Sequence, residues 1–87
     1  MLYRLKKLNR NQNMELELDT KGLNCPLPVL KAKKAMKQIE KGSTLKIFAT
    51  DPASVIDFNH FCHTAGHTLL ESNDTQGVYT YIIKKGG

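Results

Sequence analysis

A cysteine beside two prolines is the feature of this 87-residue chain whose chemistry is most specific. Cys25 precedes Pro26, Leu27 and Pro28 in the stretch "GLNCPLPVLKAKKAMK", after which apolar residues recur at helical spacing. This pattern predicts that Cys25 is the N-cap of a helix whose first residue is Pro26. Because the prolines remove backbone donors that a helix start leaves unpaired, the amides of Leu27 and Val29 are predicted to lie near the sulfur.

This predicted position favours a reactive thiol at Cys25. The positive end of a helix dipole stabilises anions, and thiols at such ends have a lowered pKa. We therefore expect the pKa of the Cys25 thiol to lie below its usual value, which suits thiol exchange, with residues 26–29 as supporting neighbours. The alternative is a small buried residue at a turn, as many free cysteines are. The Pro-x-Pro setting argues for the reactive thiol.

The second cysteine is predicted to be structural. Cys62 falls on the apolar face of a later helix, 37 residues after Cys25, so we expect two separate thiols and no disulfide. The neighbouring histidines do not bring together the four ligands that zinc normally needs, so we expect no metal site and no cofactor. Of these histidines, His60 is predicted to be solvated and His63 to be partly covered; the third is His67.

Lysines form a stripe on the first predicted helix, opposite its apolar face. Such a stripe is usually a solvated surface. It could also bind an acidic partner or an RNA backbone, and Lys31 and Lys34 are the candidates for partner binding.

The periodicity of apolar residues predicts the helices and strands that must position these side chains. The predicted elements are strands at 14–20, 43–50, 67–72 and 78–85, helices at 26–41 and 51–65, and a hairpin loop at 73–77. Asp51 is the expected cap of the second helix, and Gly42 and Gly66 are expected to end the two helices. The predicted buried faces are Val29, Ala32, Met36 and Ile39 on the first helix, and Val55, Phe58, Cys62 and Ala65 on the second.

The predicted order β-α-β-α-β-β indicates an α/β fold. We expect a two-layer sandwich in which two helices cover one face of a mixed four-stranded sheet, formed by residues 14–87. Residues 1–13 are predicted to be a basic tail that is either a non-native extension or disordered. This tail contributes +4 of the net charge of +5, so the domain itself is nearly neutral, and its charge is no argument for binding nucleic acid.

No part of the sequence has the ~18 consecutive apolar residues of a membrane span. Residues 1–13 also lack the apolar stretch of ~7–15 residues found in a secretory signal. We expect a cytoplasmic protein that acts as a monomer, without a membrane and without stable binding of nucleic acid.

The chain resembles the TusA/SirA-like sulfur-carrier family over residues 15–87. The resemblance rests on "LDTKGLNCPLPVLKAKKAMK", on "DPAS", on "FCHTAGHTLLES" and on the ending "YIIKKGG". It implies the same fold and a carrier, sulfurtransferase-like but not a turnover enzyme, in which Cys25 takes persulfide sulfur from a cysteine desulfurase and passes it to a downstream relay protein. In the best-known branch the sulfur reaches 2-thiouridine in tRNA. Leu27 stands where that branch often has an acidic residue.

Two other functions stay open at this point. Ubiquitin-like sulfur carriers also end in Gly-Gly and carry sulfur as a C-terminal thiocarboxylate, but those chains start with a β-hairpin, whereas here a helix follows the first predicted strand. A small RNA-binding or regulatory α/β module without thiol chemistry is the third possibility. The nearly neutral domain and the lack of an aromatic pair for base stacking argue against it.

Overall fold

The structure, a computed structural model, describes residues 3–7 and 14–86. The predicted order of four strands and two helices is confirmed within residues 14–86, and one further strand precedes it. The elements are β1 (Tyr3–Lys7), β2 (Met14–Thr20), α1 (Leu27–Met36), β3 (Thr44–Ala49), α2 (Ser54–Ala65), β4 (Thr68–Thr75) and β5 (Val78–Lys84).

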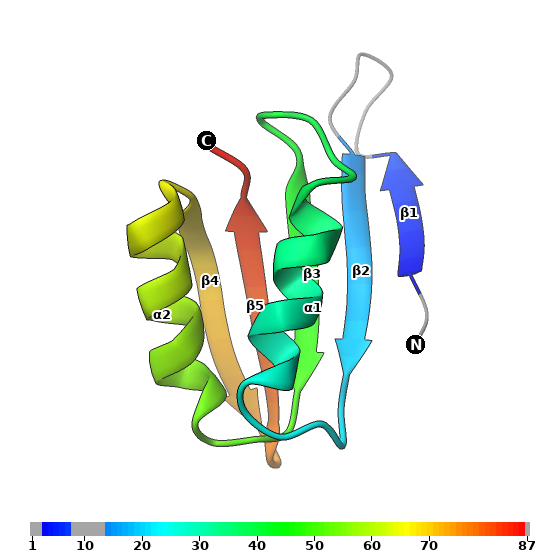
Figure 1. Ribbon diagram of the computed structural model, residues 1–87. Coiled ribbons are helices and arrows are strands. Elements are labelled where there is room, and N and C mark those ends of the chain that lie inside the picture. Colours follow the sequence, from blue (N-terminus) through cyan, green and yellow to red (C-terminus); the bar gives the residue numbers. More distant parts are fainter. Residues whose placement is uncertain (1–2, 8–13, 87) are drawn as a thin grey trace.

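The elements form two layers, as predicted (Figure 1). The sheet has the order β1-β2-β3-β5-β4, with β2 and β3 parallel and the other neighbouring pairs antiparallel. Both helices lie on the same face of this sheet and run in the same direction. The two-layer α/β sandwich with a mixed sheet is therefore confirmed.

Strand β1 is an addition that the sequence did not predict. It lies inside the segment expected to be a tail and pairs antiparallel with β2, from Tyr3 opposite Leu18 to Lys7 opposite Met14. The rest of that segment, residues 1–2 and 8–13, lies outside the described residues. The division into a tail at 1–13 and a domain at 14–87 stays a prediction.

The core lies between the sheet and the two helices. Alternate residues of the central strands face the helices, among them Leu18, Ile47 and Tyr81, each fully buried. The predicted face of α1 is buried, except that Val29 is half-buried. On α2 the buried face is Ser54, Phe58, Phe61 and Cys62. The predictions of Val55 and Ala65 as core were wrong. The helix is rotated so that Phe61 is buried, and Val55 and Ala65 are exposed.

Helix α1 ends earlier than predicted. Its last residue is Met36, not Lys41, and the chain then turns through residues 37–42 toward β3. Ile39 is still buried, because this turn folds it back onto the core. Gly42, with φ of +93°, makes the sharp change of direction, and its amide donates to the carbonyl oxygen of Lys85 at 2.9 Å.

The hairpin between β4 and β5 is tighter than predicted. Strand β4 continues to Thr75, so only Gln76 and Gly77 connect it to β5. Both have positive φ, 51° and 83°, which is the backbone of a two-residue type I′ turn.

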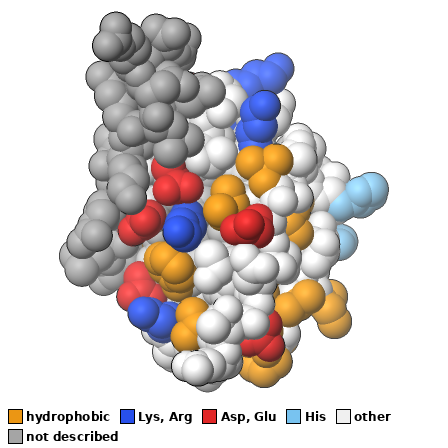
Figure 2. All heavy atoms as spheres, turned by 180° about the vertical axis from the view of Figure 1, so that it is seen from behind, with side chains coloured by type: hydrophobic (Ala, Val, Ile, Leu, Met, Phe, Trp, Pro, Cys, Tyr) orange, Lys and Arg blue, Asp and Glu red, His pale blue; other side chains and the backbone are white. Residues whose placement is uncertain are grey.

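The face of the sheet away from the helices carries mixed side chains (Figure 2). Hydrophobic, basic and acidic groups are interspersed there, and the ring of Phe48 lies 5.8 Å from Lys21 Nζ and 5.6 Å from Lys46 Nζ. This visible face has no patch of a single charge sign. Neither helix of the described chain has the length and apolar character needed to cross a membrane.

Candidate functional site

Cys25 lies exposed in the loop between β2 and α1. This loop and the loop from β3 to α2 both follow the carboxyl ends of the two parallel strands, so they meet at one edge of the sheet (Figure 1). In open α/β sheets this edge is the usual place for functional residues, because loops from neighbouring strands converge there.

The start of α1 differs by one residue from the prediction. Pro26 is the N-cap, and the helix begins at Leu27, so the prediction of Cys25 as N-cap was wrong. The Cys25–Pro26 peptide bond is cis. The Leu27 amide donates to the carbonyl oxygen of Asn24 at 2.8 Å and is therefore not free to face the sulfur. Of the predicted supporting residues, Pro28 is buried and Leu27 is 43% exposed.

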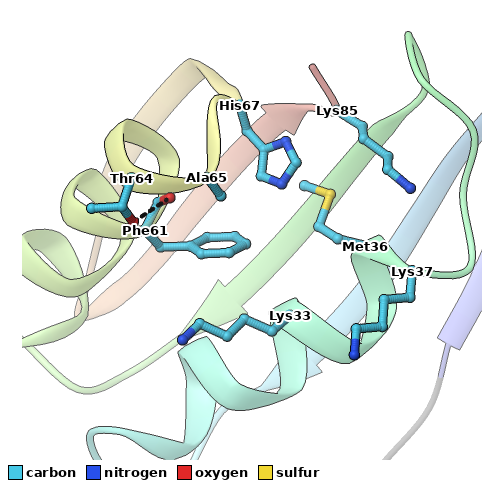
Figure 3. Close-up of a pocket in the computed structure, with 8 residues that line it drawn as sticks. All are labelled: Lys33, Met36, Lys37, Phe61, Thr64, Ala65, His67 and Lys85. Atoms are coloured by element: carbon cyan, nitrogen blue, oxygen red, sulfur yellow. Dashed lines mark hydrogen bonds between the residues drawn. The ribbon is translucent and has the colours of Figure 1, made fainter. Parts of the chain in front are cut away.

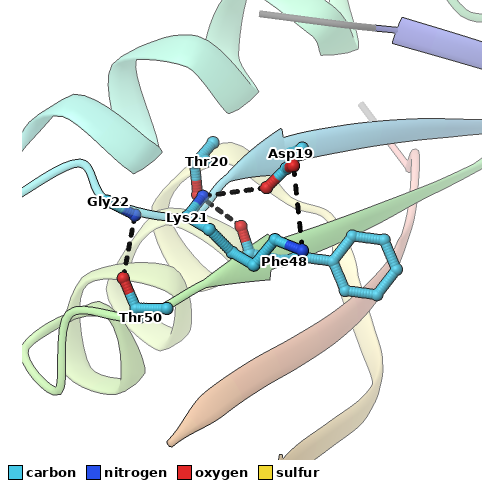
Figure 4. Close-up of polar contacts among 6 residues, drawn as sticks. All are labelled: Asp19, Thr20, Lys21, Gly22, Phe48 and Thr50. Atoms are coloured by element: carbon cyan, nitrogen blue, oxygen red, sulfur yellow. Dashed lines mark hydrogen bonds and ion pairs between the residues drawn. The ribbon is translucent and has the colours of Figure 1, made fainter.

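Hydrogen bonds to β3 and its following residue hold the loop that carries Cys25 (Figure 4). The Thr20 hydroxyl donates to the carbonyl oxygen of Phe48 at 2.6 Å, and the Gly22 amide donates to the Thr50 hydroxyl at 2.9 Å. A turn bond from the Leu23 amide to the Thr20 carbonyl oxygen, 3.1 Å, closes the first part of the loop. The end of β2 is thus fixed to the end of β3, and the loop leaves from a defined point.

Two carboxylates near the start of α2 contact Cys25. The Cys25 amide donates to Asp51 Oδ2 at 2.5 Å, and the Cys25 thiol donates to Asp57 Oδ2 at 2.6 Å. The other oxygen of Asp51 accepts from the Ala53 amide at 3.1 Å. The prediction of Asp51 as the cap of α2 was wrong, because the helix starts at Ser54 with Ala53 as N-cap. Asp51 instead joins the two loops.

These carboxylates change the expected chemistry of the thiol. The hydrogen bond to Asp57 raises the pKa of Cys25; partial desolvation and the negative charges of Asp57 and Asp51 add to the effect. The expectation of a lowered pKa was therefore wrong. The helix that follows Cys25 was the only basis of that expectation, whereas Asp57, which was not predicted, lies 32 residues away in the sequence. Its place in the first turn of α2 is the signal that could have identified it.

A groove runs between the two helices from the Cys25 loop. Its near part is a hollow of about 300 Å³, lined among others by Pro26, Val29 and Asp57, with the 75% exposed Ile56 at its rim. Its far part is a hollow of about 550 Å³ that reaches the C-terminal ends of both helices (Figure 3). We call the two hollows together the interhelical groove.

Cys62 lies in the core, as expected from its place in the sequence. Its side chain is 4% exposed, and burial raises the pKa of the thiol to about 11. Both cysteines are free thiols. Only Cys25 is therefore accessible to another protein.

The histidines do not form a metal centre within residues 3–7 and 14–86, where no group of three or more His, Cys, Asp or Glu is suitably placed. His60 is exposed, as predicted, and His63 is exposed as well, so the prediction that it is partly covered was wrong. His67 is half-buried, with its ring edge-on to Phe61 at 5.3 Å between centroids. Burial and the nearby charge of Lys85 lower the pKa of His67.

The C-terminal glycines have a structural explanation at Gly86. Its amide donates to His67 Nδ1 at 3.1 Å, and a Cβ atom there would lie 2.4 Å from the carbonyl oxygen of Gly66. Gly87 lies outside the described residues. Close packing thus explains the glycine at position 86. This glycine is therefore no argument for chemistry at the carboxyl terminus.

The candidate lysines lie on α1 outside the groove. Lys31 is half-buried and Lys34 is exposed, and neither lines the interhelical groove. Lys33 and Lys37 line its far part instead. Partner binding by Lys31 and Lys34 stays a prediction.

Comparison with known proteins gives consistent similarities. The family profile for Sulfurtransferase TusA matches residues 16–85. The Sulfur carrier protein TusA of Allochromatium vinosum is 45% identical over 73 residues, which is 84% of this chain and 96% of the relative. A putative sulfur carrier protein of Neisseria meningitidis serogroup A is 45% identical over 67 residues, 77% of this chain and 90% of the relative. The crystal structure of a SirA-like protein from Desulfitobacterium hafniense has a TM-score of 0.71 at 26% identity, covering 82% of this chain and 97% of that one.

Proposed function

Because this chain belongs to the TusA sulfurtransferase family, we propose that it carries persulfide sulfur on Cys25. The donor is a cysteine desulfurase, the acceptor is a further relay protein, and the relay leads to 2-thiouridine in tRNA in the cytoplasm. The observation that carries the proposal is the exposed Cys25 thiol held against Asp57 at the loop edge of the sheet.

In the loading step, the Cys25 sulfur attacks the outer sulfur of the donor persulfide while the thiol proton passes to Asp57. The contact of 2.6 Å between the two groups supports this transfer, since a general base must lie within hydrogen-bond reach of the proton it removes. The donor's sulfur–sulfur bond breaks and the donor cysteine leaves as a thiolate. One sulfur atom moves and no oxidant or reductant is consumed.

In the hand-over step, a partner thiolate attacks the outer sulfur of the Cys25 persulfide. The protonated persulfide is the better electrophile, and the negative charge of Asp51 disfavours an anion at this place, as it does for the thiol, while Asp57 holds the proton that it took in the loading step. Cys25 then leaves as a thiolate and regains the proton from Asp57. The acids therefore favour release of the sulfur rather than its storage as an anion.

The position of the second thiol supports a carrier with a single loading site. Cys62 is buried in α2 with a raised pKa, so it is a poor nucleophile and cannot attack the persulfide from the solvent side. A reactive thiol beside Cys25 would release the sulfur by forming a disulfide.

Sulfur loading is tested by incubating the chain with a cysteine desulfurase and cysteine, followed by intact-mass measurement. We expect a gain of one sulfur atom per chain that dithiothreitol removes. The gain is lost in Cys25→Ser and kept in Cys62→Ser. Loading that survives Cys25→Ser would contradict the proposal.

The end of the relay is tested separately, in cells that carry Cys25→Ser. We expect less 2-thiouridine in their tRNA than in cells with the unchanged chain. Unchanged 2-thiouridine would place the carrier in another pathway. RNA binding that falls with salt and survives Cys25→Ser, in a chain that takes up no sulfur, would favour the RNA-binding alternative.

A further inference from the structure

We propose that the interhelical groove binds an acidic segment, anchored by an apolar side chain, of the protein that donates sulfur to Cys25. This inference rests on the proposed function, because it identifies the surface through which that function is served. The groove has a length, a floor and a charge distribution that together indicate this kind of partner.

The groove is continuous with the thiol site. Its two hollows share Lys33, Phe61 and Thr64, so they form one path between the helices. Pro26 and Asp57, which line the near hollow, are the chain neighbour and the hydrogen-bond partner of Cys25. A segment lying in the groove therefore reaches the sulfur without any movement of the helices.

The floor of the far hollow is apolar. Met36 comes from α1, and Phe61 and Ala65 come from α2, with their side chains directed into the space between the helices (Figure 3). A hollow of about 550 Å³ accommodates one large apolar side chain of a partner. Burial of such a side chain contributes ~1.5–3 kcal/mol, so the floor supplies an anchor.

The rim of the far hollow is basic. Lys33 and Lys37 extend from α1, and Lys85 follows β5, whereas none of the described Asp and Glu residues lines this hollow. The Lys85 ammonium is held in place by donating to the carbonyl oxygen of Ile39 at 2.7 Å. These cations have no acidic neighbour in the hollow, so they complement a negatively charged partner.

An acidic polypeptide fits this surface better than RNA does. RNA binding relies on many phosphate contacts and on exposed aromatic faces for the bases, whereas here only three lysines line the hollow, the Phe61 ring is buried, and the His67 ring is half-buried and lies edge-on to it. The near hollow contains Asp57, which repels any anion next to the thiol, so the acidic part of the partner's segment lies among the lysines of the far hollow. The occupant of the groove is therefore a segment of the donor protein, and the test below distinguishes it from RNA.

The test compares two ways of loading Cys25 in the full chain. The charge-reversal pair Lys33→Glu with Lys37→Glu is expected to lower the rate of sulfur transfer from a cysteine desulfurase about tenfold at low salt, because rim charges mainly change association rates. Loading by inorganic polysulfide, which needs no docking, is expected to stay unchanged. The matched control, Lys41→Glu with Lys84→Glu, reverses two exposed charges outside the groove and is expected to leave both rates unchanged.

A second variant tests the groove without removing a lysine. Thr64→Glu puts an acid between the two hollows and is expected to slow transfer from the desulfurase, while His63→Glu on the exposed side of α2 is not. The proposal is overturned if the groove variants and their controls slow transfer equally, or if neither groove variant slows it. It is also overturned if Lys33→Glu with Lys37→Glu weakens binding of RNA but leaves transfer from the desulfurase unchanged. If the unchanged chain takes up no sulfur from polysulfide at Cys25, that result would instead contradict the carrier function itself.

Discussion

The Cys25 thiol is controlled by side chains from a distant part of the chain. Its amide and its sulfur both donate to carboxylates that belong to the segment before and within α2. The cysteine itself and its proline neighbours were identified from the sequence, because a thiol in that setting has few structural explanations. Asp57 was not, since its contact with Cys25 exists only after β2 and β3 pair in parallel.

Replacement of Asp57 by Asn tests this control. Because the hydrogen bond to Asp57 is the main cause of the raised pKa of Cys25, we expect the thiol of Asp57→Asn to ionise at lower pH. The measurement is the rate of alkylation by iodoacetamide as a function of pH, which should reach its midpoint at a lower pH than in the unchanged chain. Asp74→Asn, an acid on exposed β4, serves as the control. An unchanged or higher midpoint in Asp57→Asn would count against the contact.

The two cysteines are expected to differ sharply in reactivity. Cys25 is exposed, whereas Cys62 is buried with a pKa of about 11. A disulfide reagent such as dithiobis-nitrobenzoate at pH 8 should therefore titrate one thiol quickly in the folded chain and the second only after unfolding in guanidinium. Two fast thiols in the folded state would contradict the buried position of Cys62.

At the scale of elements, the periodicity of apolar residues predicted which segments are helices and strands but not where they end. Helix α1 stops at Met36 because the chain must turn there to place Ile39 in the core and reach β3. The rotation of α2 that buries Phe61 depends on how the helix packs against α1, β4 and β5, which the spacing of its own residues does not determine. Both errors are failures to foresee tertiary contacts.

A buried hydrogen bond fixes α2 on the sheet. The hydroxyls of Ser54 and Tyr81 lie 2.8 Å apart, and the rings of Tyr81 and Phe58 have centroids 4.8 Å apart. Tyr81→Phe leaves the Ser54 hydroxyl buried without this partner, so we expect the free energy of unfolding to fall by ~1–3 kcal/mol in urea titrations. The double variant with Ser54→Ala should lose less than the sum of the two single changes. Additive losses would show that the two groups do not interact.

At the scale of the whole molecule, the two-layer sandwich was predictable and the edge strand was not. Alternating and helical patterns define residues 14–86 well, whereas "YRLKK" in β1 lacks the clean alternation of a strand and is recognisable only by its pairing with β2. The C-terminal end is similar. The contact of Gly86 with His67 joins the segment after β5 to the residue before β4, and no local pattern predicts it.

The stability of the fold around the contact between His67 and Gly86 should depend on pH. The folded state lowers the pKa of His67, so the unfolded chain binds a proton first as the pH falls. The stabilisation is complete above the usual histidine pKa of ~6.5 and decreases below it. Urea unfolding is measured from about pH 7.5 to about pH 5, a range that spans the usual histidine pKa. As the pH falls, the free energy of unfolding should decrease more steeply in the unchanged chain than in His67→Gln. Exposed His60→Gln should keep the steeper loss, and equal slopes for all three would contradict the prediction.

The central claim is that the transported sulfur binds to Cys25, and peptide mapping tests it most directly. Trypsin places the three conceivable carriers in separate peptides: Cys25 in residues 22–31, Cys62 in residues 47–84 and the terminal glycines in residues 86–87. The chain is loaded by a cysteine desulfurase with cysteine that is isotopically labelled at sulfur, and the product is capped with an alkylating agent. The label should then lie entirely in the 22–31 peptide. Label on the Cys62 peptide or on the C-terminal glycines would contradict the account.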